Sequence, residues 1–115
     1  MNNYLIYKHY LFYITEKVNG ETHHVLISRS LFYAGQRSSL PQVGYRPDAV
    51  FDNAGNYWGI TFVELQADRF DVPIPAIIKF TFEEYHYSEI SVGATFSIME
   101  GGHKVGVGKI IGMDI

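Results

Sequence analysis

The chain has 115 residues, a formal net charge of −3 and no cysteine. This length predicts a single domain over residues 1–115, and the lack of cysteine excludes disulfides and thiolate metal sites. Hydrophobic residues make up 47% of the chain, which excludes intrinsic disorder, and the acidic balance argues against wholesale electrostatic binding of nucleic acid.

The first hydrophobic stretch, residues 4–15, reads YLIYKHYLFYIT. Its aromatic and β-branched side chains predict one long strand. Lys8 and His9 interrupt the apolar run, so we expect neither a signal peptide nor a membrane span, and therefore a cytoplasmic protein. Asn19-Gly20 then predicts a hairpin turn into a partner strand over residues 22–28.

The middle of the chain alternates short apolar runs with turn residues. Residues 29–41 predict a loop in which Leu31-Phe32-Tyr33 forms either a short strand or one turn of helix. Three further strands are predicted over residues 44–51, 57–65 and 76–82, with Pro73-Ile74-Pro75 as a stiff connector. In the third of these strands we expect Ile78, Phe80 and Phe82 to share one face, and we place residues 83–92 at its exposed end.

The C-terminal stretch predicts two strands, residues 95–99 and 105–113, joined at Gly101-Gly102. Gly106 and Gly108 fall on one face of the second strand. Glycine weakens a strand unless something must approach it closely, so we expect another backbone or a partner beside this face. About seven strands and no helical period predict an antiparallel barrel or sandwich.

Two motifs in this chain resemble the third domain of elongation factor Tu and related translational GTPases. Glu100-Gly101-Gly102, Val105-Gly106 and Gly108 match a family hairpin written R-E-G-G-R-T-V-G-A-G. Upstream, Gly44-Tyr45-Arg46-Pro47 matches the family's G-x-R-P, which precedes an aromatic-rich strand. The motifs occur in the family's order, and the resemblance covers residues 4–113. It implies a small antiparallel β-barrel of about six or seven strands, present without the GTPase domain.

The resemblance also implies a binding role. In that family the third domain helps to hold transfer RNA and contacts the GTPase domain and the exchange factor. The matched positions that would contact a protein or RNA partner are Arg46, Gly101, Gly102, His103 and Lys104. His103 and Met99 stand where the family has arginines, and Lys104 stands where it has threonine. This net loss of positive charge favours a protein partner, with RNA as the second expectation.

A second hypothesis rests on an acidic and aromatic cluster. Its members are Glu83, Glu84, Tyr85, Tyr87 and Glu89. Tyrosine beside charge is common in protein interfaces, so the chain could be an immunity or antitoxin-type inhibitor that blocks a basic toxin. His86 among these carboxylates leaves a small hydrolase or nuclease as a third reading, although no nucleophile–base pair stands at a recognisable spacing.

Other binding chemistries are excluded by spacing. Gly108-Lys109 is followed by Ile110, and His103 stands where a phosphate-binding loop needs its first glycine, so we expect no nucleotide. The histidines show no H-x-H or H-x-x-x-H pair, and we expect no metal, no other cofactor and no enzymatic activity. A homodimer formed through an edge strand stays open at this stage.

Overall fold

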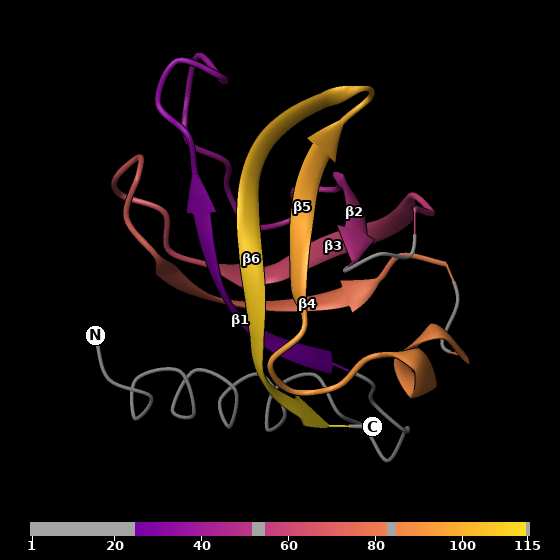
Figure 1. Cartoon of the computed structure of the whole chain (residues 1–115). Coiled ribbons are helices and arrows are strands. Elements are labelled where there is room, and N and C mark those ends of the chain that lie inside the picture. Colours follow the sequence, from indigo (N-terminus) through magenta and orange to yellow (C-terminus); the bar gives the residue numbers. More distant parts are fainter. Residues whose placement is uncertain (1–24, 52–54, 83–84, 115) are drawn as a thin grey trace.

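Six antiparallel strands close into a β-barrel in the computed structural model, which describes residues 25–51, 55–82 and 85–114 (Figure 1). The strands are β1 (Val25–Phe32), β2 (Asp48–Phe51), β3 (Trp58–Leu65), β4 (Ile74–Phe80), β5 (Thr95–Glu100) and β6 (His103–Asp114). This confirms the predicted all-β barrel. The strand predicted over residues 4–15 lies outside the described residues.

The order of strands around the barrel is β1-β4-β3-β2-β5-β6, and β6 pairs with β1 to close it. The meander β2–β3–β4 is followed by a return to β5, which lies beside β2, so the topology is a Greek key. In Figure 1, β5 and β6 run across the front of β3 and β4. Residues 33–47, between β1 and β2, and residues 85–94, ahead of β5, lie at opposite ends of the barrel (Figure 1).

The interior is filled by alternate side chains of all six strands, as the period of two predicts. Along β3, for example, Ile60 and Phe62 are fully buried, as the sequence pattern predicts. The main core consists of Leu26, Phe32, Ala49, Phe51, Ile60, Phe62, Leu65, Ile74, Ala76, Ile78, Phe80, Tyr87, Ile90, Phe96, Ile98, Val105 and Ile110.

Gly106 and Gly108 of β6 lie against other parts of the chain, which confirms the close approach expected from the sequence. A Cβ at Gly106 would collide with the Leu31 carbonyl, and a Cβ at Gly108 would collide with the ring of Phe96. Val105, which precedes Gly106, is fully buried and belongs to the main core. The pairing of β5 with β6 shifts its register between Ile98 and Met99, close to this position.

Some predicted boundaries were wrong. β1 continues to Phe32 instead of giving way to a loop at residue 29, because Leu31 and Phe32 pair with β6. β4 begins at Ile74, inside the predicted connector.

The predicted continuation of β4 was also wrong. The strand ends at Phe80, and Phe82 is 82% exposed instead of sharing the buried face. A short 3₁₀ helix, η1 (Tyr85–Glu89), follows in place of an extended strand end. The turn of the chain brings Tyr87 back into the core.

Closure of the barrel removes free strand edges from the described sheet, since every strand pairs on both sides. The edge-to-edge pairing considered for a homodimer therefore has no strand to use in this part of the chain. Within the described ranges, no helix is long and apolar enough to cross a membrane.

Candidate functional site

The two sequence motifs meet at one end of the barrel. Residues 33–47 connect β1 to β2 and run near the turn between β5 and β6, at the upper end of the barrel in Figure 1. There the hydroxyl of Tyr45, from the upstream motif, donates a hydrogen bond of 2.5 Å to Oε2 of Glu100, from the hairpin motif. The connection between the motifs is thus direct.

Tyr45 is anchored from below by aromatic packing. Its ring lies 5.5 Å from that of Phe62 and 5.9 Å from that of Phe32, and both of these rings are fully buried. The backbone at Gly44 and Tyr45 also bonds to Phe62, through Gly44 N–H to the Phe62 carbonyl and Phe62 N–H to the Tyr45 carbonyl. Residues 44–45 therefore pair with β3 before β2 begins.

Arg37 completes the contact. Its Nε donates to the same Oε2 of Glu100 at 2.6 Å, and its guanidinium lies 4.8 Å from the centre of the Tyr45 ring. Arg37 also donates through Nη1 to the carbonyl of Ser39 within its own loop. We call Arg37, Tyr45 and Glu100 the clasp, because these three side chains fasten the loop to the hairpin.

The clasp shifts the pKa values of two of its members. Burial, followed by the hydrogen bond to Glu100, raises the pKa of Tyr45 well above its ordinary value of 10.0, so the hydroxyl remains a donor. Partial burial acts to raise the pKa of Glu100, but the hydrogen bonds from Tyr45 and Arg37 and the nearby positive charges outweigh it. The pKa of Glu100 therefore lies below its ordinary value of 4.5, and the carboxylate is charged at neutral pH.

This pKa shift predicts an acid-sensitive contribution to stability. A carboxyl with a lowered folded pKa stabilises the fold above its unfolded pKa and loses that contribution as the pH falls through the folded value. We expect Glu100→Gln to lower the free energy of unfolding at pH 6 by less than about 1 kcal/mol, since the ion pair is partly exposed. Urea unfolding between pH 6 and pH 3 gives the free energy of unfolding at each pH, and we expect the values of the wild type and the variant to converge as the pH falls. A difference in free energy that stays constant with pH would contradict the lowered pKa of Glu100.

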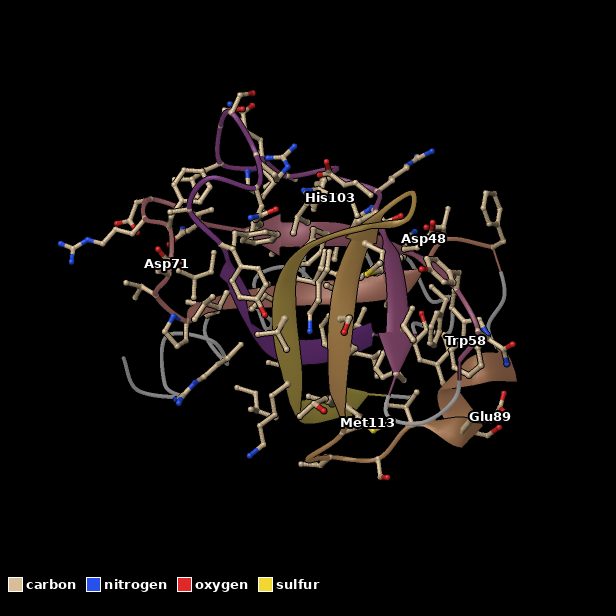
Figure 2. All side chains as sticks on the ribbon, turned by 45° about the horizontal axis from the view of Figure 1, so that its top comes forward. Asp48, Trp58, Asp71, Glu89, His103 and Met113 are labelled. Carbon is tan, nitrogen blue, oxygen red and sulfur yellow. The ribbon has the colours of Figure 1, made fainter. Side chains whose placement is uncertain are left out.

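The structure gathers the five residues predicted from the resemblance at this same end. Gly101 adopts a positive φ of 62° in the hairpin turn, and Gly102 beside it is exposed. Nε2 of His103 donates to the carbonyl of Gln36 at 3.3 Å, which adds a second tie between hairpin and loop. Arg46 and Lys104 are exposed. Figure 2 shows His103 at this end, above the strand that begins at Asp48.

Sequence reasoning missed the residues that organise the site. Glu100 and Tyr45 lie inside the two motifs, but the resemblance implies contact roles only for their neighbours. Arg37 lies in the polar run Gln36-Arg37-Ser38-Ser39, which gave only a loop signal. The one signal in the sequence is the type of residue, since a tyrosine that packs on a core needs a hydrogen-bond partner for its hydroxyl.

Of the acidic and aromatic cluster, the described residues place Tyr87 in the core and not on a contact surface. Tyr87 is only 3% exposed, and its ring packs 4.8 Å from that of Phe80. Tyr87 belongs to the main core, and its hydroxyl accepts a hydrogen bond of 2.8 Å from the buried Phe80 N–H. Tyr85 and Glu89 lie in η1, and Glu83 and Glu84 lie outside the described residues.

The hydrogen bond from Phe80 to Tyr87 predicts a stability effect. Tyr87→Phe should cost about 1–3 kcal/mol of unfolding free energy, because it removes the acceptor for a buried backbone N–H. The matched control is Tyr57→Phe, since Tyr57 is 51% exposed, and we expect a change within about 0.5 kcal/mol. Denaturant unfolding of the two variants makes the comparison, and equal losses would contradict this role of the Tyr87 hydroxyl.

Among the described residues, no group of three or more histidine, aspartate or glutamate side chains could hold a metal ion. Comparison with protein-family models, with curated proteins and with solved structures found no match for the chain.

Proposed function

We propose that the protein is a non-catalytic binding module and that the hairpin end of its barrel binds a protein partner. The observation that carries this proposal is the clasp, which holds Glu100 with two donors at 2.5 and 2.6 Å. The exposed side chains beside it, Arg46, His103 and Lys104, are thereby presented on a fastened loop and hairpin. A contact surface ordered before binding loses less conformational entropy when its partner docks.

The distribution of charge supports a protein partner over RNA. Glu100 engages the charge of Arg37, so the exposed cations named for partner contact are Arg46 and Lys104. Affinity for nucleic acid grows with the number of phosphates that cations neutralise. Two such cations on a chain of net charge −3 supply few of these contacts.

The resemblance to the elongation factor third domain supports the same end of the barrel. Its two motifs supply Tyr45 and Glu100, which are in direct contact. A closed antiparallel barrel is the architecture that the resemblance implies. The proposal adds that the hairpin end serves for docking in this chain, independently of a GTPase domain.

Affinity capture from extract of the source cells tests this proposal. Three tagged proteins are compared, namely the wild type, Arg46→Ser/Lys104→Ser, and a control with the same charge change, Lys79→Ser/Lys109→Ser. Lys79 and Lys109 are exposed but lie on the sides of the barrel, in β4 and β6. We expect the wild type and the control to retain the same protein partner. The Arg46→Ser/Lys104→Ser variant should bind this partner about tenfold more weakly, which corresponds to a loss of about 1.4 kcal/mol of binding free energy.

Nuclease treatment of the same extract separates the two partner classes. Retention that survives nuclease supports a protein partner. Retention abolished by nuclease would mean that the partner is RNA and not a protein. The affinity for that RNA should then fall steeply as the salt concentration rises. Equal retention by both double variants would reject the hairpin end as the docking surface.

A further inference from the structure

A group of aliphatic side chains on the outside of the barrel is as fully buried as the core. Along β1, Leu26 points into the barrel, so its neighbours Val25 and Ile27 point outward. Along β4, Ala76 and Ile78 belong to the core, so Ile77 between them points outward as well. Yet Val25, Ile27 and Ile77 are only 1%, 3% and 1% exposed.

These side chains form a contiguous patch. Ile27 and Ile77 are direct partners in the β1–β4 ladder, and Val25 and Ile77 form a hydrophobic cluster separate from the main core. Val63 packs against that cluster, at the position where β3 shifts its register against β4. We call Val25, Ile27, Val63 and Ile77 the outer patch.

This burial of outward-facing side chains is confined to the outer patch and does not continue along β4. Lys79 points to the same side of β4, two residues beyond Ile77, and it is exposed. An outward residue of a barrel normally faces water, so burial at the outer patch requires a covering layer. In the described part of the chain, Val63 is the hydrophobic side chain that packs on the Val25–Ile77 cluster from its edge.

The position of the patch identifies the segment of the chain that is suited to cover it. β1 begins at Val25, within the patch, and residues 1–24 immediately precede it. Of these, residues 4–15 read YLIYKHYLFYIT and are hydrophobic except for Lys8, His9 and Thr15. Residues 16–24 can span up to about 30 Å when extended, which is ample to bring that stretch back over the patch.

We propose that residues 4–15 pack in cis on the outer patch and form a second layer outside the barrel. A segment tethered to the edge of its docking surface has an effective concentration in the millimolar range, which a separate molecule does not reach. Four aliphatic side chains are also far fewer than the roughly 20–30 residues a side of a stable interface between two chains. The intramolecular occupant is therefore favoured over a second copy.

The absence of cysteine allows a direct test in the full-length protein. Ile77→Cys places a single thiol in the patch, and Lys79→Cys places one at the exposed position on the same side of the same strand. We expect a maleimide to label the Ile77→Cys variant about 100-fold more slowly, at a rate that is equal at 1 and 100 µM protein. Equal labelling of the two thiols, or protection that increases with protein concentration, would overturn the proposal. Ile27→Cys provides a second position if Ile77→Cys does not give the wild-type circular dichroism spectrum.

A photocrosslink identifies the covering segment. Replacement of Val63 by p-benzoylphenylalanine places the reactive group at the edge of the patch, where the native side chain is half-buried. Irradiation should give a crosslinked monomer whose peptides map to residues 4–15. Because Val63 also packs against Val25 and Ile77, crosslinks to these neighbours are expected in any case. A crosslinked dimer, or crosslinked monomers with no peptide from residues 4–15, would overturn the assignment.

Discussion

Gly106→Ala should destabilise the barrel by about 3 kcal/mol, although it adds a single methyl group. The new Cβ would collide with the carbonyl oxygen of Leu31, and the carbonyl carbon of Leu31 and Cα of Phe32 lie close behind it. All of these atoms are backbone, so no rotamer change relieves the contact. Overfilling a packed site typically costs 1–3 kcal/mol, and the rigid neighbours here place the cost at about the upper end.

The location of Gly106 explains why the effect spreads. Gly106 pairs with Phe32 of β1 on one side and with Ile98 of β5 on the other. The β1–β6 pairing joins the first and last described strands and closes the barrel. Relief of the collision therefore requires β1 and β6 to separate at the end of the barrel that carries the clasp.

Denaturant unfolding measures this effect, and Gly102→Ala is the matched control. Nothing lies within 4 Å of a Cβ built at Gly102, so we expect its free energy of unfolding to stay within about 0.5 kcal/mol of the wild type. At about 4 °C per kcal/mol for a domain of this size, Gly106→Ala should lower Tm by on the order of 12 °C. A Gly106→Ala variant as stable as the control would show that the close approach of β1 and β6 is wrong.

The strands and the special role of the β6 glycines could be predicted because both are local signals. Alternation of apolar residues predicts a strand within its own few residues, and β3 followed that pattern. A glycine in a strand signals a close neighbour, and this held for Gly106 and Gly108. The identity of the neighbour could not be predicted, because Leu31 and Phe96 reach those glycines only through pairing between distant strands.

The clasp could not be predicted because its members are brought together only by the Greek-key topology. Arg37 and Glu100 are 63 residues apart, and Tyr45 and Glu100 are 55 residues apart. The sequence placed all three near turns, but the contact requires residues 33–47 to run toward the β5–β6 turn. Composition predicted a loop there and gave no indication of its path.

For Tyr87 the sequence made a wrong prediction, because the local pattern indicated an exposed side chain. Flanking carboxylates and tyrosines predicted a surface patch, yet the ring is buried against Phe80. In the 3₁₀ turn of η1, Tyr87 is directed inward while the next two residues, Ser88 and Glu89, are exposed. A charged neighbourhood in the sequence therefore did not establish exposure, since a tight turn changes which side chain faces the core.

Phe62→Ala should have the largest effect of any single truncation near the candidate site, a loss of about 3–5 kcal/mol. Phe62 is fully buried and its ring contacts those of Phe32 and Tyr45. Its removal leaves a cavity beneath the tyrosine that anchors the clasp. Because domains of this kind are stable by only about 5–15 kcal/mol, this variant approaches the limit of folding, and Phe62→Leu provides a milder form.

The control separates loss of stability from loss of the site. Ile110→Ala removes another fully buried side chain, near the opposite end of the barrel, where Ile110 N–H bonds to the carbonyl of Ala94. We expect a comparable loss of about 2–5 kcal/mol from this variant. Only Phe62→Ala should also remove the ring on which Tyr45 rests, and so loosen the bond from Gly44 N–H to the Phe62 carbonyl.

Amide hydrogen exchange at Gly44, measured under conditions where both variants are folded, distinguishes the two effects. Gly44 protection should fall further in Phe62→Ala than its lower global stability accounts for, whereas in Ile110→Ala it should fall only in proportion to global stability. Captured partner should follow the same order, with Phe62→Ala and Phe62→Leu weakened relative to Ile110→Ala. If protection of the Gly44 amide falls only in proportion to global stability in both alanine variants, the aromatic anchor does not position the clasp. The proposal of a surface ordered before binding would then fail as well.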